Sequence, residues 1–101
     1  MGKKSPTQLS LDYLNKLGYT CQIVEHWNSF ARVRQDCFGF GDILAYHRNG
    51  TIALIQTSTA SNFSARKKKI LDSWHYLGWK AAGGIILLLC WGPKGLREEE
   101  L

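Results

Sequence analysis

The chain has 101 residues, of which 45% are apolar and 21% are charged, with only two prolines. This composition excludes a disordered or collagenous chain, and the length predicts one folded domain rather than a large multidomain enzyme. Thirteen Lys and Arg against eight Asp and Glu give a formal charge of +5, which favours an acidic partner such as nucleic acid.

The first predicted element is a helix that begins at Pro6. Ser5 is a suitable N-cap, Pro6 occupies the first helical position, and Gln8 completes a capping box. The helix then carries one apolar stripe, formed by Leu11, Leu14 and Leu17, and Gly18 can end it.

Three strands are predicted next, over residues 19–27, 41–47 and 51–58. The first is rich in β-branched and aromatic side chains and is followed by a loop around Asn28. The second and third flank Arg48-Asn49-Gly50, which predicts a hairpin turn between them.

A second helix is predicted from about Asn62 to Leu77, with Gly78 ending it. Its apolar sector consists of Phe63, Ile70, Leu71, Trp74 and Leu77. The run from 85 to 91 does not alternate and predicts a strand covered on both faces. The same run is far shorter than the roughly 20 apolar residues that cross a bilayer, so we expect a soluble, cytoplasmic protein with no membrane contact.

The predicted order is therefore αβββαβ, an α/β domain whose mixed sheet is flanked by helices. We expect the domain to span residues 5–92. Residues 1–4 and 93–101 are expected to be flexible tails, and the second of these contains the Glu98-Glu99-Glu100 run.

The register of the hairpin decides which polar side chains can cooperate, because a slip of one residue turns every side chain to the opposite face. With a two-residue turn, Asp42 lies opposite Thr57 and Gln56 points to the other face. With a three-residue loop and Gly50 in the left-handed conformation, Asp42 lies directly opposite Gln56, and Ser58 shares their face. We favour the second register.

The basic run of the second helix divides by geometry. At 100° per residue, Asn62, Arg66 and Lys69 lie beside the apolar sector and can face the edge of the sheet. Lys68 points to solvent, whereas Lys67 lies over the apolar sector and must extend its ammonium outward.

This order of elements, with Gly41-Asp42 opening one strand and Ile55-Gln56-Thr57-Ser58 ending its partner, resembles the PD-(D/E)XK nuclease superfamily. The similarity is greatest to its small Holliday-junction-resolvase-like and VRR-NUC-type domains of phages and bacteria, and it covers about residues 5–92. The family motif is an Asp followed by Glu-x-Lys on the next strand. Asp42 matches the Asp, but Gln56 replaces the Glu and Ser58 replaces the Lys.

The resemblance implies a restriction-endonuclease-like core and a Mg²⁺ or Mn²⁺ centre held by Asp42, Gln56 and the carbonyl of Thr57. The implied catalytic residues are Asp42, Gln56, Ser58 and Lys69, with Arg66 as a second choice for the cation, because some members of the fold supply it from the helix. Glu25 or Gln8 is a candidate additional ligand. The alternatives are an ion pair of Glu25 with Arg32 or Arg34, and helix capping for Gln8.

Candidate nucleic-acid contacts lie outside this motif as well. Arg32 and Arg34 alternate with apolar residues, so both can lie on one side of an extended segment and reach phosphates. A solvated, partly paired edge is the competing interpretation. Trp27 and Trp91 can stack on a base, although packing is the default for all four tryptophans, and Trp74 and Trp79 are expected in the core. The full expected contact set is Arg32, Arg34, Asn62, Arg66, Lys67, Lys68 and Lys69.

These features predict a metal-dependent DNA endonuclease, with branched DNA as one expected substrate, acting as a homodimer by analogy with resolvases. Because Ser58 cannot replace an ammonium, the alternative is a DNA-binding module of the same fold that has lost cleavage. A basic protein-interaction domain ranks third.

Overall fold

The structure, a computed structural model, describes residues 4–101, so the expected tail at residues 1–3 lies outside the described part of the chain. Its first helix, α1 (Pro6–Lys16), begins as predicted: Ser5 is the N-cap, and its side chain accepts a hydrogen bond from the backbone N–H of Gln8 at 3.1 Å. Leu17 is the C-cap, and Gly18 follows with a φ of 96°, a conformation that favours glycine.

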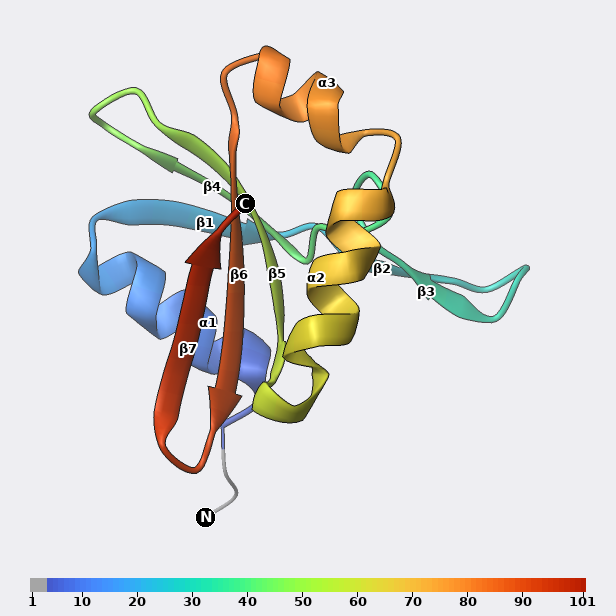
Figure 1. Ribbon diagram of the computed structural model, residues 1–101, viewed down its shortest axis with the longest axis horizontal. Helices are drawn as coiled ribbons and strands as arrows, with labels where there is room; N and C mark the ends of the chain where they lie inside the picture. Colours follow the sequence, from blue (N-terminus) through green and yellow to red (C-terminus); the bar gives the residue numbers. More distant parts are fainter. Residues whose placement is uncertain (1–3) are drawn as a thin grey trace.

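Five strands form a mixed sheet in the order β1-β4-β5-β6-β7 (Figure 1). β5 and β6 are parallel, and the other neighbours are antiparallel. The strands are β1 (Tyr19–Ile23), β4 (Ile43–His47), β5 (Ile52–Thr59), β6 (Ile85–Gly92) and β7 (Gly95–Glu100). The predicted α/β class, with a mixed sheet flanked by helices, is confirmed.

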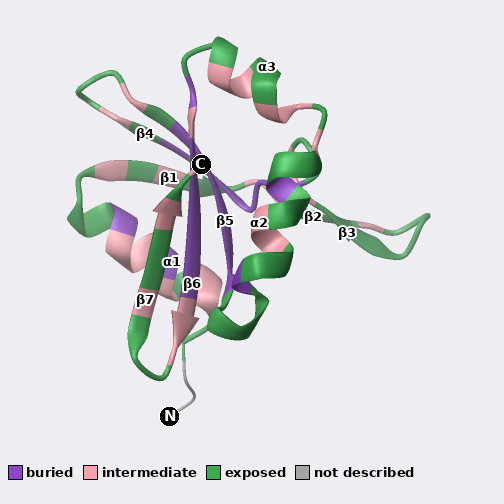
Figure 2. Ribbon diagram, in the orientation of Figure 1, coloured by how far each residue is buried: buried purple, intermediate pink, exposed green. Residues whose placement is uncertain are grey.

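The two faces of the sheet carry separate apolar clusters, which explains why β5 and β6 lack alternation and are buried along most of their length (Figure 2). α1 covers one face, where Leu14 packs with Ile55 and Leu89. The other face is covered by η1 (Ala60–Asn62) and α2 (Phe63–Asp72), whose Ile70 packs with Leu54.

The β4–β5 hairpin has the favoured register. Ile43 pairs with Ile55 and Tyr46 with Ile52, which leaves residues 48–50 as a three-residue loop. Gly50 has a φ of 96° and donates its N–H to the carbonyl of His47 at 3.0 Å. Asp42, one residue before β4, therefore lies across from Gln56.

The strand predicted over residues 19–27 is wrong in its second half. β1 ends at Ile23 because its partner β4 begins at Ile43, and after one further backbone bond, from Val24 to Asp42, the chain has no neighbour in the sheet. It leaves the sheet and pairs with the next segment instead. β2 (His26–Asn28) and β3 (Val33–Gln35) form a separate two-stranded ribbon.

The single helix predicted over 62–77 is also wrong. α2 ends at Asp72, and α3 (Tyr76–Ala81) begins after a break, with Gly78 inside it. Ser73 is extended, with a φ of −70° and a ψ of 131°, and its hydroxyl donates to the carbonyl of Phe38 and accepts from the N–H of His75. This bonding competes with helix continuation. Trp74 is consequently 85% exposed rather than in the core, and Leu77 is also exposed.

The flexible C-terminal tail expected over residues 93–101 is instead an edge strand. β7 pairs with β6 along its length, and Gly95, with a φ of 104°, closes the turn between them. The guanidinium of Arg97 lies 3.6 Å from the centre of the Phe63 ring. The glutamates line the outer strand of the sheet, so their charge is compatible with an ordered strand.

None of the helices in the described residues is long and apolar enough to span a membrane.

Gly41, which precedes Asp42, is predicted to be required for stability because a Cβ there would overlap the side chain of the fully buried Leu54. Gly41→Ala should lower the free energy of unfolding by about 1–3 kcal/mol, the usual cost of overpacking a core. Gly78→Ala is the control, since a Cβ at that helical position meets nothing within 4 Å. Urea denaturation measures both, and equal stability of Gly41→Ala and wild type would contradict the packing.

Candidate functional site

Asp42 is fixed between two strands at the end of the sheet. Its backbone N–H donates to the carbonyl of Ile55 at 2.8 Å, and its carbonyl accepts from the N–H of Val24 at 2.9 Å. Its side chain is only 4% exposed, and Oδ2 accepts hydrogen bonds from Nε2 of Gln56 at 2.7 Å and from the N–H of Thr57 at 2.9 Å. The predicted meeting of Asp42 and Gln56 is therefore present.

Gln56 has one unsatisfied end. Its side chain is 3% exposed, and Oε1 is the only buried side-chain nitrogen or oxygen of the described residues without a hydrogen-bond partner. An unpaired buried acceptor costs about 1–3 kcal/mol. Nε2 donates to the Asp42 carboxyl in the amide orientation of the structure, which leaves Oε1 as the atom without a partner.

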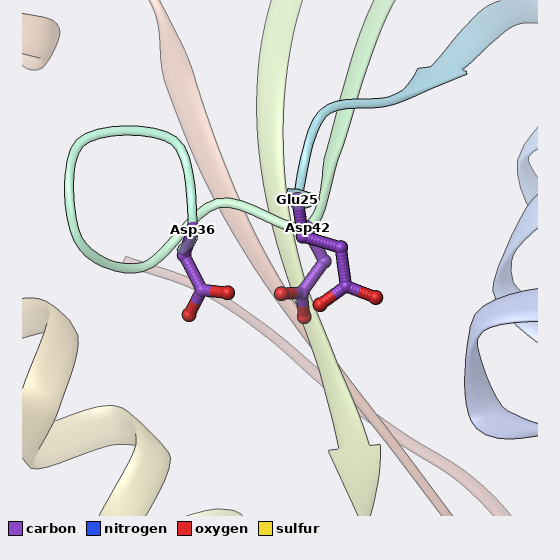
Figure 3. A group of neighbouring side chains, drawn as sticks. All are labelled: Glu25, Asp36 and Asp42. Atoms are coloured by element: carbon purple, nitrogen blue, oxygen red, sulfur yellow. The ribbon is translucent and has the colours of Figure 1, made fainter. Parts of the chain in front are cut away.

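Three carboxylates converge at this point (Figure 3). Glu25, Asp36 and Asp42 each offer a ligand oxygen, and these oxygens lie within 4.8 Å of one another. Glu25 reaches the site because it follows Val24, whose N–H is bonded to Asp42. Glu25 was a candidate ligand from the sequence, but Asp36 was not.

A tight loop brings Asp36 back beside Asp42. Cys37 and Gly41 exchange two backbone hydrogen bonds, each 2.8 Å long. Phe38 and Gly39, with φ values of 55° and 82°, allow the reversal between them. The sequence signal for this loop is the pair of glycines in the Phe38-Gly39-Phe40-Gly41 run, which lies between Asp36 and Asp42.

Basic side chains neutralise the acidic group. Lys69 Nζ lies 2.7 Å from Oδ2 of Asp36, and Arg34 Nη1 lies 3.4 Å from Oε1 of Glu25. Arg66 also borders the site but makes no ion pair among the described residues. Together these groups line a cavity of about 270 Å³, formed by Glu25, Arg34, Asp36, Asp42, Gln56, Thr57, Arg66 and Lys69.

Asp42 holds its proton more tightly than an ordinary carboxyl. Burial, together with the negative charges of Asp36 and Glu25, raises its pKa from 3.8 to about 7, although the hydrogen bond from the Thr57 N–H lowers it. A buried carboxyl with a perturbed pKa in a cavity is typical of functional sites.

Ser58 and Asn62 do not line this cavity. Ser58 shares the sheet face of Gln56, as predicted, but its hydroxyl accepts from Nδ2 of Asn62 at 3.2 Å. Gln8 is exposed on α1, and its side-chain amide donates to Asp12 at 3.0 Å. Its side chain does not reach the site, and its backbone serves the helix cap.

The other predicted cations are dispersed. Lys67 pairs with Glu99 of β7, and Lys68 pairs with Asp72 on the outer side of α2. Arg32 lies in the turn between β2 and β3, with a φ of 54°. The prediction that Arg32 and Arg34 share one extended segment is wrong, because the chain reverses at Arg32.

The opposite face of the sheet supports Thr57. Its hydroxyl lies 2.8 Å from that of the buried Ser10 on α1, and Ser10 in turn accepts from Nε1 of Trp91 at 2.9 Å. Trp91 also packs edge-on against Tyr13. Trp91 therefore has a packing role, and the network holds the strand whose backbone supports Asp42.

Comparison with models of known protein families, with curated proteins and with solved structures finds no match to this chain. Its function is therefore inferred from the geometry of its own residues.

The raised pKa of Asp42 predicts a pH-dependent stability. The folded pKa of about 7 exceeds the ordinary 3.8, so the folded protein binds the extra proton between these values and loses stability as pH rises through 7. We compare Asp42→Asn with wild type in the presence of a metal chelator. From pH 5 to pH 8, the free energy of unfolding of Asp42→Asn should rise relative to that of wild type by about 1–3 kcal/mol. Denaturation curves at both pH values measure this difference.

The matched control for this titration is Asp72→Asn, on the outer face of α2. Asp72 is exposed and pairs only with Lys68 among the described residues, so its substitution should change little across the same range. A stability difference between Asp42→Asn and wild type that is the same at pH 5 and pH 8 would contradict the burial of an ionisable Asp42.

Proposed function

We propose that this protein is a divalent-metal-dependent nuclease that hydrolyses phosphodiester bonds in DNA, built on a PD-(D/E)XK-like core. One observation carries the proposal: three carboxylates converge at a cavity that is also lined by Gln56, whose buried Oε1 has no hydrogen-bond partner. Each of these groups offers an oxygen atom that can bind a metal ion. Oε1 of Gln56 accepts no hydrogen bond from the described residues.

The donor set fits a hard cation. Mg²⁺ and Mn²⁺ take carboxylate and carbonyl oxygens, and Asp42, Asp36, Glu25 and Gln56 supply such atoms around one cavity. The carbonyl of Thr57 is a further candidate, because Thr57 also lines the cavity and directs its N–H toward Asp42. The family Glu is replaced by Gln56, which offers one neutral oxygen.

The positive side chains of α2 suit a phosphate. Arg66 lines the cavity without an ion pair among the described residues, so its guanidinium is available to a phosphate. Lys69 is held on Asp36 and occupies the helix position from which some members of the fold supply their catalytic ammonium. Both cations can stabilise the charge that develops on a phosphate under attack.

A bound divalent ion would polarise the scissile phosphate and lower the pKa of a water. The residues of the chain have separate tasks around it. Thr57 and Gln56 orient the Asp42 carboxylate through two hydrogen bonds, and Arg66 binds phosphate from the facing helix. The pKa of about 7 for Asp42 means that the site must release a proton when it takes up a cation near neutral pH.

A DNA-binding module without cleavage is the second candidate, and one observation favours it. Asp36 and Glu25 already have cationic partners in Lys69 and Arg34, so most of the acidic charge is neutralised without a metal. The basic side chains that remain accessible would then bind DNA phosphates without supporting cleavage.

Cleavage of supercoiled plasmid DNA distinguishes the two candidates. Wild-type protein should nick or linearise the plasmid with Mg²⁺ or Mn²⁺ and not with EDTA. Asp42→Asn should lower the rate by about 100-fold or more, because it removes a charged group at the reacting centre. The control Asp72→Asn, at an exposed position that does not line the cavity, should cleave like wild type. Equal cleavage by Asp42→Asn would reject this centre, and absence of cleavage by wild type with intact DNA binding would favour the module.

Gln56→Glu tests the role of the unpaired oxygen. If Oε1 faces the cation, an added negative ligand should tighten Mn²⁺ binding by about tenfold, measured by calorimetry at pH 8. Gln22→Glu is the control, since Gln22 is exposed on β1. Unchanged Mn²⁺ affinity in Gln56→Glu would show that this side chain does not contact the ion.

A further inference from the structure

The β2–β3 ribbon projects away from the sheet and its helices (Figure 1). Its two strands pair only with each other among the described strands. A two-stranded ribbon is at best marginally stable by itself in water. Most of its residues are exposed to solvent and are therefore available to a partner.

The ribbon exposes large apolar side chains. Phe30, in the turn, is 100% exposed, and Trp27 on β2 is 59% exposed. Val33 on β3 is exposed as well. Together they place two aromatic rings and an aliphatic side chain on one small projection, which a soluble protein rarely leaves uncovered unless they bind something.

The turn that carries Phe30 is ordered by its own side chains. Oδ1 of Asn28 accepts hydrogen bonds from the N–H groups of Phe30 and Ala31, both at 3.0 Å. This Asx-type turn fixes the backbone at the tip. Phe30 therefore lies on a turn of defined conformation, and binding loses less conformational entropy than it would with a flexible loop.

The charge of the ribbon favours one class of occupant. Residues 26–35 include Arg32 and Arg34 and no acidic residue. A second copy of the same ribbon would bring like charges together, which opposes self-association. Exposed aromatic rings beside arginines match unpaired bases with their phosphates, because bases stack on aromatic rings and arginine binds phosphate.

The ribbon also begins and ends at the acidic site. Glu25 directly precedes β2, and Asp36 directly follows β3. Phe30 is five residues from Glu25, so the extended chain separates them by at most about 17 Å. A duplex rises 3.4 Å per step, so the backbone of Phe30 lies within the length of about five duplex steps of Glu25.

We infer that the ribbon binds unpaired bases of DNA through Phe30 and Trp27, so that the protein binds DNA with unpaired bases more tightly than continuous duplex. This inference rests on the proposed function for its choice of DNA as the substrate. Arg32 binds a phosphate of the same strand.

The test measures binding in EDTA by fluorescence anisotropy, with two labelled DNAs of equal length: a fork with unpaired arms and a fully paired duplex. Phe30→Ala should weaken fork binding by at least about fivefold, the factor that corresponds to the lower limit for stacking one base on an aromatic ring. Its duplex affinity should change less than twofold. Trp74→Ala is the matched control, because Trp74 is an exposed aromatic residue on another segment, and it should bind both DNAs like wild type.

A salt series separates the two kinds of contact. Arg32→Ala should reduce the slope of log affinity against log salt by about 1, as expected for one lost phosphate contact. Phe30→Ala should leave this slope unchanged, since stacking involves no released counterion. An unchanged slope in Arg32→Ala would remove Arg32 from the contact.

Two results would overturn the inference: wild-type fork affinity in Phe30→Ala, or a wild-type dimer in sedimentation that Phe30→Ala converts to monomer, which would make a second copy the occupant. Because the assay contains no metal, it is independent of cleavage. Loss of fork binding in Phe30→Ala without plasmid cleavage by wild type would retain the ribbon contact and reject the nuclease. If wild type cleaves the plasmid and Phe30→Ala binds the fork like wild type, the nuclease is retained and the ribbon contact is rejected.

Discussion

The candidate site depends on one buried contact, in which Oδ2 of Asp42 accepts hydrogen bonds from the Gln56 amide and the Thr57 N–H. Burial of a carboxyl is costly unless hydrogen bonds compensate for lost hydration. The two donors come from consecutive residues of β5, one a side chain and the other backbone. They are available together only in the register that places Asp42 across from Gln56, because a slip of one residue would turn that amide to the α1 face.

Local chemistry made this register predictable, whereas the acidic partners depend on long-range structure. A three-residue loop ending in Gly50 was sufficient to place Asp42 and Gln56 together. Asp36 reaches the site only because the chain reverses at Phe38 and Gly39, and the glycines indicate a turn without specifying where it leads. The break after α2 was hidden similarly, since Ser73 leaves the helix to bond Phe38, 35 residues away in sequence. The ribbon escaped prediction because its strands have three residues each, too few for a period to be recognised.

The balance of charge around the cavity connects the two candidate functions. Three acidic and three basic side chains line it: Glu25, Asp36 and Asp42 with Arg34, Arg66 and Lys69. Without a cation, Lys69 and Arg34 neutralise two of the acids, and Asp42 keeps its proton near neutral pH. Under the proposed function, a divalent ion that replaced these partners would free two positive side chains to bind a phosphate. The same residues therefore serve phosphate binding more strongly when the acids hold a metal than when they are paired internally.

The three acids differ in how firmly the fold holds them. Asp42 is anchored on both sides by backbone hydrogen bonds to neighbouring strand segments. Glu25 and Asp36 lie at the two ends of the ribbon, which is joined to the body through these short connections. Each of them nevertheless stands beside a residue that is bonded next to Asp42, because Val24 donates to the Asp42 carbonyl and Cys37 exchanges two bonds with Gly41. Under the proposed function, DNA held at Phe30 would therefore be kept at a defined position relative to the three carboxylates by these short connections.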